Sequence, residues 1–146
     1  MSHHHHGGGA AVVEAGAARV ALVGSPNAGK TTLFNGLTGL RAKTGNYPGV
    51  TVARYEGTAH TPAGAVVVED LPGTYSLDPI SPDEEIVAQV LDQADELAGV
   101  LVVVDATHPK RGLGLVAQVQ QAGLPMAVVL TFVDELVRRG GRVDPE

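Results

Sequence analysis

The sequence predicts an α/β fold in which a mostly parallel sheet carries helices on both faces and contains one antiparallel hairpin. Along most of the chain, short apolar segments of strand length alternate with segments whose apolar residues recur at helical spacing, which is typical of parallel βαβ units. Near the start, two β-rich segments flank the turn signal Thr61-Pro62-Ala63-Gly64 and are expected to pair as a hairpin. The length of 146 residues suits a single domain.

In the first half of the chain, the predicted elements are strands at 19–23, 51–58 and 65–70 and a helix at 30–40. The first strand is a short apolar run that ends at Gly24, and the helix carries Leu33, Phe34 and Leu37 at helical spacing. Two polar segments that contain Gly and Pro, residues 41–49 and 71–79, are expected to be loops.

The second half opens with a helix-start signal. Ser81 can cap the helix, Pro82 suits its first position, and Glu84 can complete a capping box. The remaining predicted elements are strands at 99–105 and 126–131 and helices at 113–121 and 135–139. The sequence therefore predicts five strands in all.

The composition excludes several classes of protein. Hydrophobic residues make up 44% of the chain, which is enough for a core and rules out a disordered or fibrous protein. There is no Cys, so disulfides and thiolate metal sites are excluded. No apolar run approaches the roughly 20 residues that cross a bilayer, and the net charge of −6 argues against broad nucleic-acid binding. We expect a soluble chain without a nucleic-acid partner.

The first 18 residues are rich in Gly and Ala and contain His3 to His6. We interpret residues 1–18 as a flexible arm, a tag or a processing remnant, and expect the folded domain to span residues 19–146.

The strongest motif is a phosphate-binding loop. Residues 24–31 read GSPNAGKT and match G-x-x-x-x-G-K-[ST] between a predicted strand and a predicted helix, where this motif belongs. Gly24 and Gly29 allow the backbone N–H groups to point inward at phosphate oxygens. Lys30 supplies a positive charge to the β- and γ-phosphates, and Thr31 offers a hydroxyl to Mg²⁺. The motif predicts nucleotide binding.

Three further segments predict a guanine-nucleotide switch. Asp70 ends a strand, where it can hold Mg²⁺ through water, and Gly73 can offer its N–H to the γ-phosphate. Thr51 lies in a loop that could close over Mg²⁺ and the γ-phosphate. Asp134 follows another strand end and can accept two N–H bonds from guanine, a pairing that adenine cannot make. The order and spacing of these segments after the phosphate loop support one site.

At this point the sequence resembles a known family. The segments GSPNAGKTTLFNGLTG, TGNYPGVTVARYEG, DLPGTYSL, SPDEE and VVVDAT together resemble the cytoplasmic GTPase domain of ferrous iron transport protein B, over about residues 19–144. The resemblance implies a Ras-like P-loop GTPase fold, GTP hydrolysis that regulates Fe²⁺ uptake, and loops at 41–51 and 70–80 that switch. It also implies a location at the cytoplasmic side of the bacterial inner membrane and a transmembrane permease region as partner. Oligomeric state is left open.

The resemblance assigns roles residue by residue. The implied nucleotide-binding set is Gly24, Ser25, Pro26, Asn27, Ala28, Gly29, Lys30, Thr31, Thr32, Thr51, Asp70, Gly73, Thr131 and Asp134. Within it, Lys30, Thr51, Gly73 and Asn27 take the catalytic roles. The implied cofactors are GTP or GDP, Mg²⁺ held by Thr31, Thr51 and Asp70, and, as in potassium-activated members, K⁺ held by Asn27. Because Thr74 stands where Ras-type enzymes carry a water-orienting Gln, a monovalent cation could supply the missing charge.

Two departures from the family pattern lead to further expectations. Thr131 replaces the Asn of N-x-x-D, and its shorter hydroxyl is expected to tie the base-binding loop less firmly to the phosphate loop. The sequence also ends before the last strand and helix of a G domain, so we expect a domain incomplete at its C-terminus.

Two other functions remain open at this stage. One is a soluble GTPase of ribosome assembly or tRNA modification, whose phosphate loop can look alike. The other is a pseudo-switch that binds nucleotide without hydrolysing it, a reading that Thr131 and the missing C-terminal elements suggest.

Overall fold

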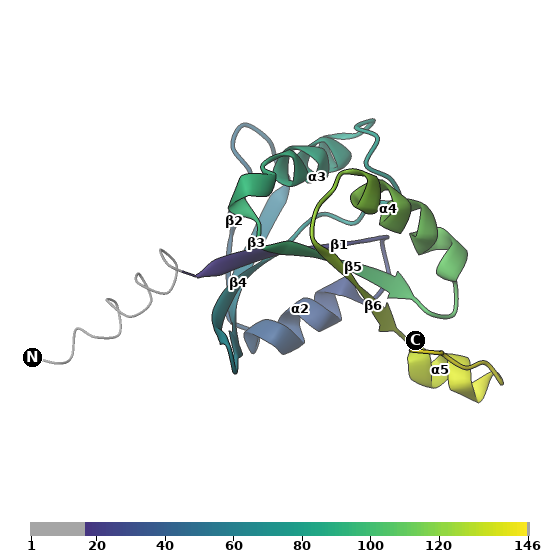
Figure 1. The fold of residues 1–146 in the computed structure, drawn as a ribbon. Coiled ribbons are helices and arrows are strands. Elements are labelled where there is room, and N and C mark those ends of the chain that lie inside the picture. The colour runs from purple at the N-terminus through teal and green to yellow at the C-terminus, as the bar shows by residue number, and fades with distance from the viewer. Residues whose placement is uncertain (1–16, 146) are drawn as a thin grey trace, which may run out of the picture.

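The computed structural model describes residues 17–145, which form one six-stranded sheet with helices on both faces (Figure 1). The elements are β1 (Ala18–Gly24), α2 (Lys30–Thr38), β2 (Ala42–Asn46), β3 (Ala53–Thr61), β4 (Gly64–Asp70), α3 (Pro82–Asp92), the short 3₁₀-helix η1 (Ala94–Glu96), β5 (Gly99–Asp105), α4 (Pro109–Gln121), β6 (Met126–Thr131) and α5 (Val133–Arg138).

The strand order is β2-β3-β4-β1-β5-β6, and the four strands β4, β1, β5 and β6 run parallel. Their carboxyl ends therefore meet at one edge of the sheet, where ligands bind in open α/β folds. β3 pairs antiparallel with β4 across the turn before Gly64, which confirms the predicted hairpin. The predicted α/β fold is thus confirmed.

The prediction of a loop over residues 41–49 was wrong, because β2 occupies part of that segment. β2 pairs antiparallel with β3, from Ala42 opposite Gly57 to Asn46 opposite Ala53. All five of its residues are exposed, so β2 has no apolar face whose period a sequence could reveal. Its position depends on backbone pairing with β3 at the sheet edge, and the sheet consequently has six strands rather than five.

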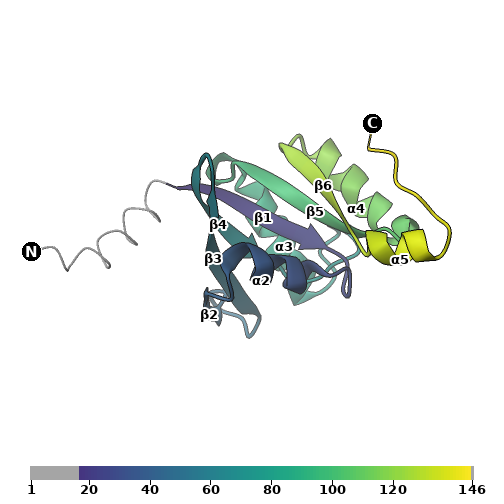
Figure 2. The same cartoon turned by 90° about the horizontal axis from the view of Figure 1, so that it is seen from below.

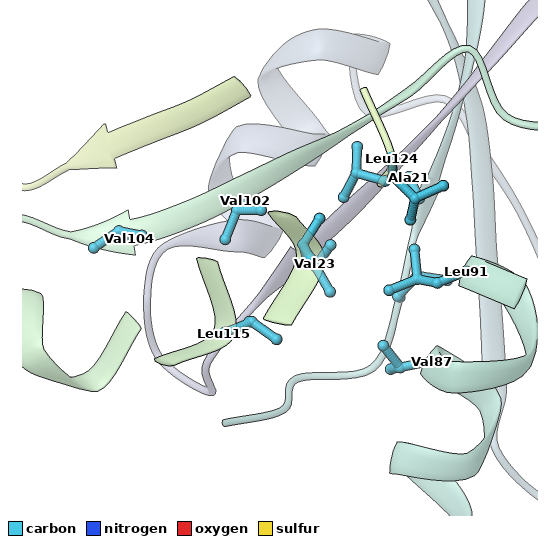
Figure 3. Packing of buried hydrophobic residues seen from close by; sticks show 11 residues of the cluster. Ala21, Val23, Val87, Leu91, Val102, Val104, Leu115 and Leu124 are labelled. Carbon is cyan, nitrogen blue, oxygen red and sulfur yellow. The ribbon is translucent and has the colours of Figure 1, made fainter. Parts of the chain in front are cut away.

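Apolar residues on β1 alternate between two cores. Ala21 and Val23 face α3 and α4 and pack with Val87, Leu115 and their neighbours (Figure 3). Leu22 faces the opposite side, where a smaller cluster forms with the α2 side chain Phe34 and with Ala59 and Val68. Figure 2 shows α2 on one face of the sheet and α3 and α4 on the other. β1 is consequently buried on both faces, as its continuous apolar run predicts.

Two helix starts illustrate what a local signal can and cannot specify. The capping box at α3 is confirmed: Ser81 Oγ accepts from the Glu84 N–H at 3.3 Å, and Glu84 Oε1 accepts from the Ser81 N–H at 3.1 Å. α4 begins at Pro109, four residues before the predicted start at 113. Its first turn is polar and therefore carries no apolar period, although Pro109 suits the first helical position.

The predicted N-terminal arm lies almost entirely outside the described residues, including His3 to His6. β1 begins at Ala18, one residue before the predicted start of the domain. Over residues 17–145, no helix has both the length and the apolar character needed to span a bilayer.

Candidate functional site

The predicted phosphate-binding loop joins β1 to α2 at the carboxyl edge of the sheet. Gly24 is the last residue of β1 and Lys30 is the first of α2. Between them, Asn27 and Gly29 have φ angles of 67° and 85°, in the left-handed region that reverses the chain. The Ala28 N–H donates to the Ser25 carbonyl at 3.2 Å and closes the turn. The sequence motif therefore forms a tight loop at a helix N-terminus, which favours an anion.

A second loop, residues 71–74, lies directly against the phosphate loop. The Thr74 N–H donates to the Gly24 carbonyl at 2.9 Å. A Cβ placed on Gly73 would stand 3.2 Å from atoms of Pro26, and one on Gly24 would stand 2.9 Å from the Val103 carbonyl oxygen. The backbones approach so closely that both positions favour glycine. The structure thereby brings together Gly24, Pro26 and Gly73 of the predicted site.

Lys30 and Asp70 meet inside this site. The Lys30 ammonium donates a hydrogen bond to Asp70 Oδ1, and both side chains are at least nine-tenths buried. Lys30 was predicted to contact phosphate and Asp70 to hold Mg²⁺. In the structure each neutralises the other, which a pair of opposite charges must do when buried.

Thr131 links the end of β6 to the phosphate loop. Its hydroxyl donates to the Ala28 carbonyl at 2.6 Å and lies 3.3 Å from the Val104 carbonyl oxygen. From the sequence, this shorter side chain is expected to tie the two loops less firmly than Asn would. The structure shows that the hydroxyl does reach the phosphate loop.

Most of the remaining predicted site residues are exposed to solvent. Asn27, Thr31, Thr32 and Thr51 are exposed, whereas Ser25 and Ala28 are buried. Asp134 is also exposed and forms an ion pair with Arg138 at 3.4 Å, one helical turn away. The structure therefore pairs Lys30 with Asp70 and sets Gly73 and Thr131 against the phosphate loop. Asp134 instead pairs with Arg138, and Thr51 is exposed.

Sequence reasoning missed two features near the site. Phe132 has a φ of 57°, is exposed, and its ring lies 3.5 Å from where a Gly29 Cβ would stand. Nothing in the sequence signals that backbone conformation.

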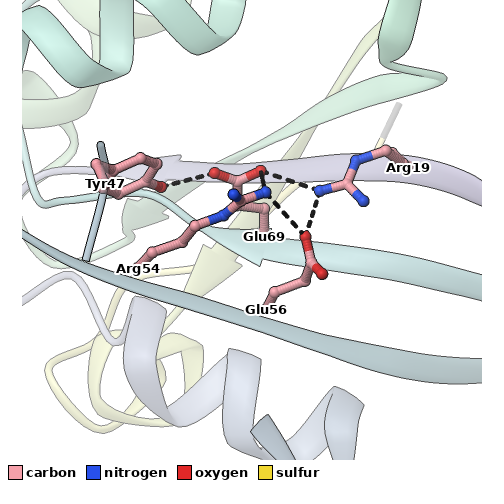
Figure 4. A network of polar contacts seen from close by, with 5 residues as sticks. All are labelled: Arg19, Tyr47, Arg54, Glu56 and Glu69. Atoms are coloured by element: carbon pink, nitrogen blue, oxygen red, sulfur yellow. Dashed lines mark hydrogen bonds and ion pairs between the residues drawn. The ribbon is translucent and has the colours of Figure 1, made fainter. Parts of the chain in front are cut away.

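The second missed feature is a network of charges beside the site. Tyr47 donates to Glu69 Oε2 at 2.6 Å, and Arg19 donates to Glu69 Oε1 at 3.2 Å (Figure 4). Arg54 lies over the Tyr47 ring at 5.7 Å and donates to Glu56 at 3.2 Å, and Arg19 also pairs with Glu56. The signal that could have revealed it is Glu69 itself, an acidic residue that follows the apolar run of β4 and precedes Asp70.

The network shifts the pKa values of its members. Burial raises the pKa of the Tyr47 hydroxyl far above its usual value, and the charge of Glu69 adds to the increase. Burial opposes ionisation of Glu56, but its hydrogen bond and charge interaction with Arg19 outweigh burial and lower the pKa of Glu56. At neutral pH Tyr47 is therefore a neutral hydrogen-bond donor, and Glu56 is a carboxylate paired with Arg19.

Comparisons with protein families and with known proteins point to the same family. The family model described as ferrous iron transport protein B matches residues 18–146. The Fe(2+) transporter FeoB of Leptospira biflexa is 46% identical over 125 residues, which is 86% of this chain and 18% of that protein. The Fe(2+) transport protein A/FeoB fusion protein of Porphyromonas gingivalis is 42% identical over 126 residues, 86% of this chain and 15% of that protein. The chain thus spans less than a fifth of the length of these relatives.

Solved structures of FeoB domains resemble this chain both in fold and in sequence. The G domain of the T. maritima FeoB iron transporter has a TM-score of 0.80 at 37% identity, covering 87% of this chain and 77% of that chain. A GDP-bound mutant of the S. thermophilus FeoB G domain has a TM-score of 0.78 at 40% identity, covering 84% of this chain and 46% of that chain. Because the family model matches nearly all of the described residues, and because these structures share the fold, the chain belongs to the ferrous iron transport protein B family.

Proposed function

We propose that this chain is a guanine-nucleotide-binding domain that hydrolyses GTP slowly with Mg²⁺ and regulates Fe²⁺ uptake through a transporter region outside the chain. The observation that carries the proposal is the buried Lys30–Asp70 pair beneath a left-handed glycine loop. A phosphate tail would replace Asp70 as the partner of Lys30, and a divalent cation would replace Lys30 as the partner of Asp70.

The residues present fit a phosphate group. The loop over residues 24–31 offers backbone N–H groups and a helix N-terminus, both of which favour an anion. Gly29 and Gly73 keep side chains out of the narrow space beside Pro26 and Thr131. Lys30 would turn its ammonium group from Asp70 to the phosphate oxygens, and Gly73 would offer its N–H to the γ-phosphate.

The oxygen donors at the site fit Mg²⁺. Mg²⁺ is usually held by one or two carboxylates together with substrate phosphates and water. Asp70 supplies one carboxylate, Thr31 a hydroxyl, and Thr51 a second hydroxyl after its loop closes. When bound, Mg²⁺ would neutralise charge that develops on the phosphate oxygens.

We infer that Asp134 selects the base. Its ion pair with Arg138 at i,i+4 is exposed, and such a pair is weak enough to leave the carboxylate available. A carboxylate accepts two N–H bonds from guanine and none of that pattern from adenine. Relatives of this chain have been crystallised with GDP, which supports the same base here.

Thr74 is not free to replace the water-orienting Gln of Ras-type enzymes. It is buried, and its hydroxyl donates to the Ser76 carbonyl at 2.5 Å. We therefore infer that K⁺ beside the phosphates, held in part by the exposed Asn27, supplies positive charge during hydrolysis. Without a side chain that orients water, turnover would be slow.

The proposal is tested by calorimetric titration with GDP and by GTP hydrolysis in Mg²⁺ buffer. We expect GDP to bind the wild-type chain, and Lys30→Ala to abolish measurable binding and turnover. Lys110→Ala, which removes an exposed lysine from the first turn of α4, is the matched control and should behave like wild type. Binding without turnover would favour the pseudo-switch, and no binding at all would contradict the proposal.

Two observations weigh against the RNA-associated alternative. The family match is to an iron transporter, and the chain carries a net charge of −6. Regulation of transport is tested in the full-length protein: Lys30→Ala should reduce Fe²⁺ uptake by cells while leaving the amount of transporter in the membrane unchanged.

A further inference from the structure

We propose that Tyr47 and Glu69 form a positioning pair that holds the loop of residues 47–52, here called the Tyr47 loop, on the α3 side of the sheet and thereby opposes the approach of Thr51 to the nucleotide. This inference rests on the proposed function, because Thr51 matters only if a triphosphate binds beside Lys30.

The end of β4 carries two carboxylates that face opposite sides of the sheet. Glu69 lies beside Ala21, whose side chain belongs to the core under α3 and α4. Asp70 lies beside Leu22, which packs on the α2 side, and it pairs with Lys30 in the phosphate site. One strand end therefore contacts the phosphate site through Asp70 and the Tyr47 loop through Glu69.

The Tyr47 loop is closed on itself. The Tyr47 N–H donates to the Val52 carbonyl at 3.0 Å, and the Val50 N–H donates to the Tyr47 carbonyl at 3.3 Å. Tyr47 is buried, whereas residues 48–51 are all exposed. Tyr47 is thus the anchor of the loop, and Thr51 is carried by a segment whose position depends on that anchor.

A cleft separates part of the loop from α3. It has a volume of about 600 Å³ and lies between the loop residues Pro48 and Val50 and the α3 residues Ile86 and Val90. Tyr47 and Glu69 line the same cleft, and their hydrogen bond ties the loop to β4 there. A hydrogen bond to a buried carboxylate is among the stronger polar contacts in proteins.

The arrangement leaves Thr51 away from its predicted role. Thr51 is exposed, and its side chain has no hydrogen-bond partner among residues 17–145. In switch GTPases, contacts with the γ-phosphate and Mg²⁺ order the first switch, and hydrolysis releases it. A triphosphate would have to draw Thr51 inward against the Tyr47–Glu69 bond, whereas a diphosphate would not.

The main test compares Tyr47→Phe with wild type for two ligands, GDP and a non-hydrolysable GTP analogue. Removing only the hydroxyl should tighten binding of the analogue about tenfold, the equivalent of one hydrogen bond to a charged group, and change GDP binding less than twofold. In a Thr51→Ala background the gain should disappear, because the pair acts through Thr51. Tyr55→Phe, which removes the hydroxyl of an exposed tyrosine on β3, should change neither affinity.

A second measurement does not depend on nucleotide. Hydrogen exchange of the Tyr47 and Val50 amides in the nucleotide-free protein should be about tenfold faster in Tyr47→Phe than in wild type, because the loop opens more often. Should wild type bind no nucleotide, the proposed function fails, and the exchange rates still decide whether the pair holds the loop.

Several outcomes would overturn the inference. These are unchanged exchange in folded Tyr47→Phe, an unchanged preference between the two nucleotides, or tighter binding that persists without Thr51. If Tyr47→Phe does not fold, Glu69→Gln replaces it. That variant keeps the shape of the acceptor and removes its charge, so it should shift exchange and nucleotide preference in the same direction by a smaller factor.

Discussion

The hydroxyl of Thr131 donates a hydrogen bond to the carbonyl of Ala28 at 2.6 Å, across 103 residues of sequence. The two residues belong to different segments of the proposed site, since Thr131 precedes Asp134, which is proposed to bind the base, and Ala28 lies in the phosphate loop. The Val104 carbonyl oxygen lies 3.3 Å from the same hydroxyl. A hydroxyl has a single hydrogen to donate, and the shorter distance assigns it to Ala28, so this side chain links the end of β6 to the phosphate loop.

Replacing Thr131 with Ala should therefore weaken GDP binding by about tenfold, because a partly buried carbonyl loses its donor at a cost of about 1–3 kcal/mol. Thr131→Ser keeps the hydroxyl and should stay within a factor of two or three of wild type. Thr131→Asn, with two donors, should bind at least as tightly as wild type. Calorimetric titration with GDP measures all three. Equal affinities for the Ala and Ser variants would show that the link does not support the site.

The sequence predicted most of the phosphate site because the relevant chemistry is local. A glycine-rich motif between a strand and a helix determines where Lys30 and Gly29 lie, and the parallel sheet brings Asp70 to the same edge. The Lys30–Asp70 contact itself could not be read from the motif, since it depends on how two strand ends sit in register.

The features that the sequence did not predict depend on contacts between distant segments of the chain. β2 has no apolar period, and only its pairing with β3 makes it a strand. Glu69 is a buried carboxylate at the end of β4, but its partners Tyr47, Arg19 and Arg54 come from three other segments. A single sequence contains no local signal for such a network.

Two glycine substitutions should have opposite effects on the domain. Gly29 has a φ of 85°, and an added Cβ would stand 3.4 Å from the Thr131 methyl group, so Gly29→Ala should strain the phosphate loop and weaken GDP binding at least tenfold. Gly36 lies inside α2 with nothing within 4 Å of an added Cβ. Gly36→Ala should raise the free energy of unfolding by about 0.5–1 kcal/mol and leave GDP binding unchanged.

Denaturant unfolding and GDP titration on both glycine variants check this prediction. A Gly29→Ala variant with wild-type affinity would mean that the left-handed conformation of Gly29 is not needed for binding.

Glu56 should make the domain sensitive to acid. Its pKa is lower in the folded chain than in the unfolded chain, where it is about 4.3, because Arg19 stabilises the carboxylate. The stabilisation is therefore complete above the unfolded pKa and is lost as pH falls through the folded value. Unfolding free energy should fall more steeply below about pH 4.3 in wild type than in Glu56→Gln.

The matched control for Glu56 is Glu135→Gln, which removes a carboxylate that pairs with Arg139 on the exposed side of α5. This variant should keep the acid sensitivity of wild type, because an exposed pair contributes little to stability. Denaturant unfolding between pH 3 and 7 gives the comparison. The same acid slope in wild type and Glu56→Gln would contradict the stabilising role of Arg19.

Potassium should accelerate GTP hydrolysis through Asn27. Thr74 is occupied by its bond to Ser76, so no side chain at that position orients water, and charge compensation must come from elsewhere. Asn27 lies exposed on the phosphate loop with a φ of 67°, where its amide oxygen can coordinate a cation beside the phosphates.

We expect turnover to be at least tenfold faster in K⁺ than in Na⁺ at equal ionic strength, a difference in barrier of about 1.4 kcal/mol. Asn27→Asp, which keeps an oxygen ligand, should retain part of the K⁺ effect, whereas Asn27→Gly, which tolerates the same φ, should lose it and still bind GDP. Phosphate release measured in the two salts decides the matter, and equal rates in wild type would remove K⁺ from the mechanism.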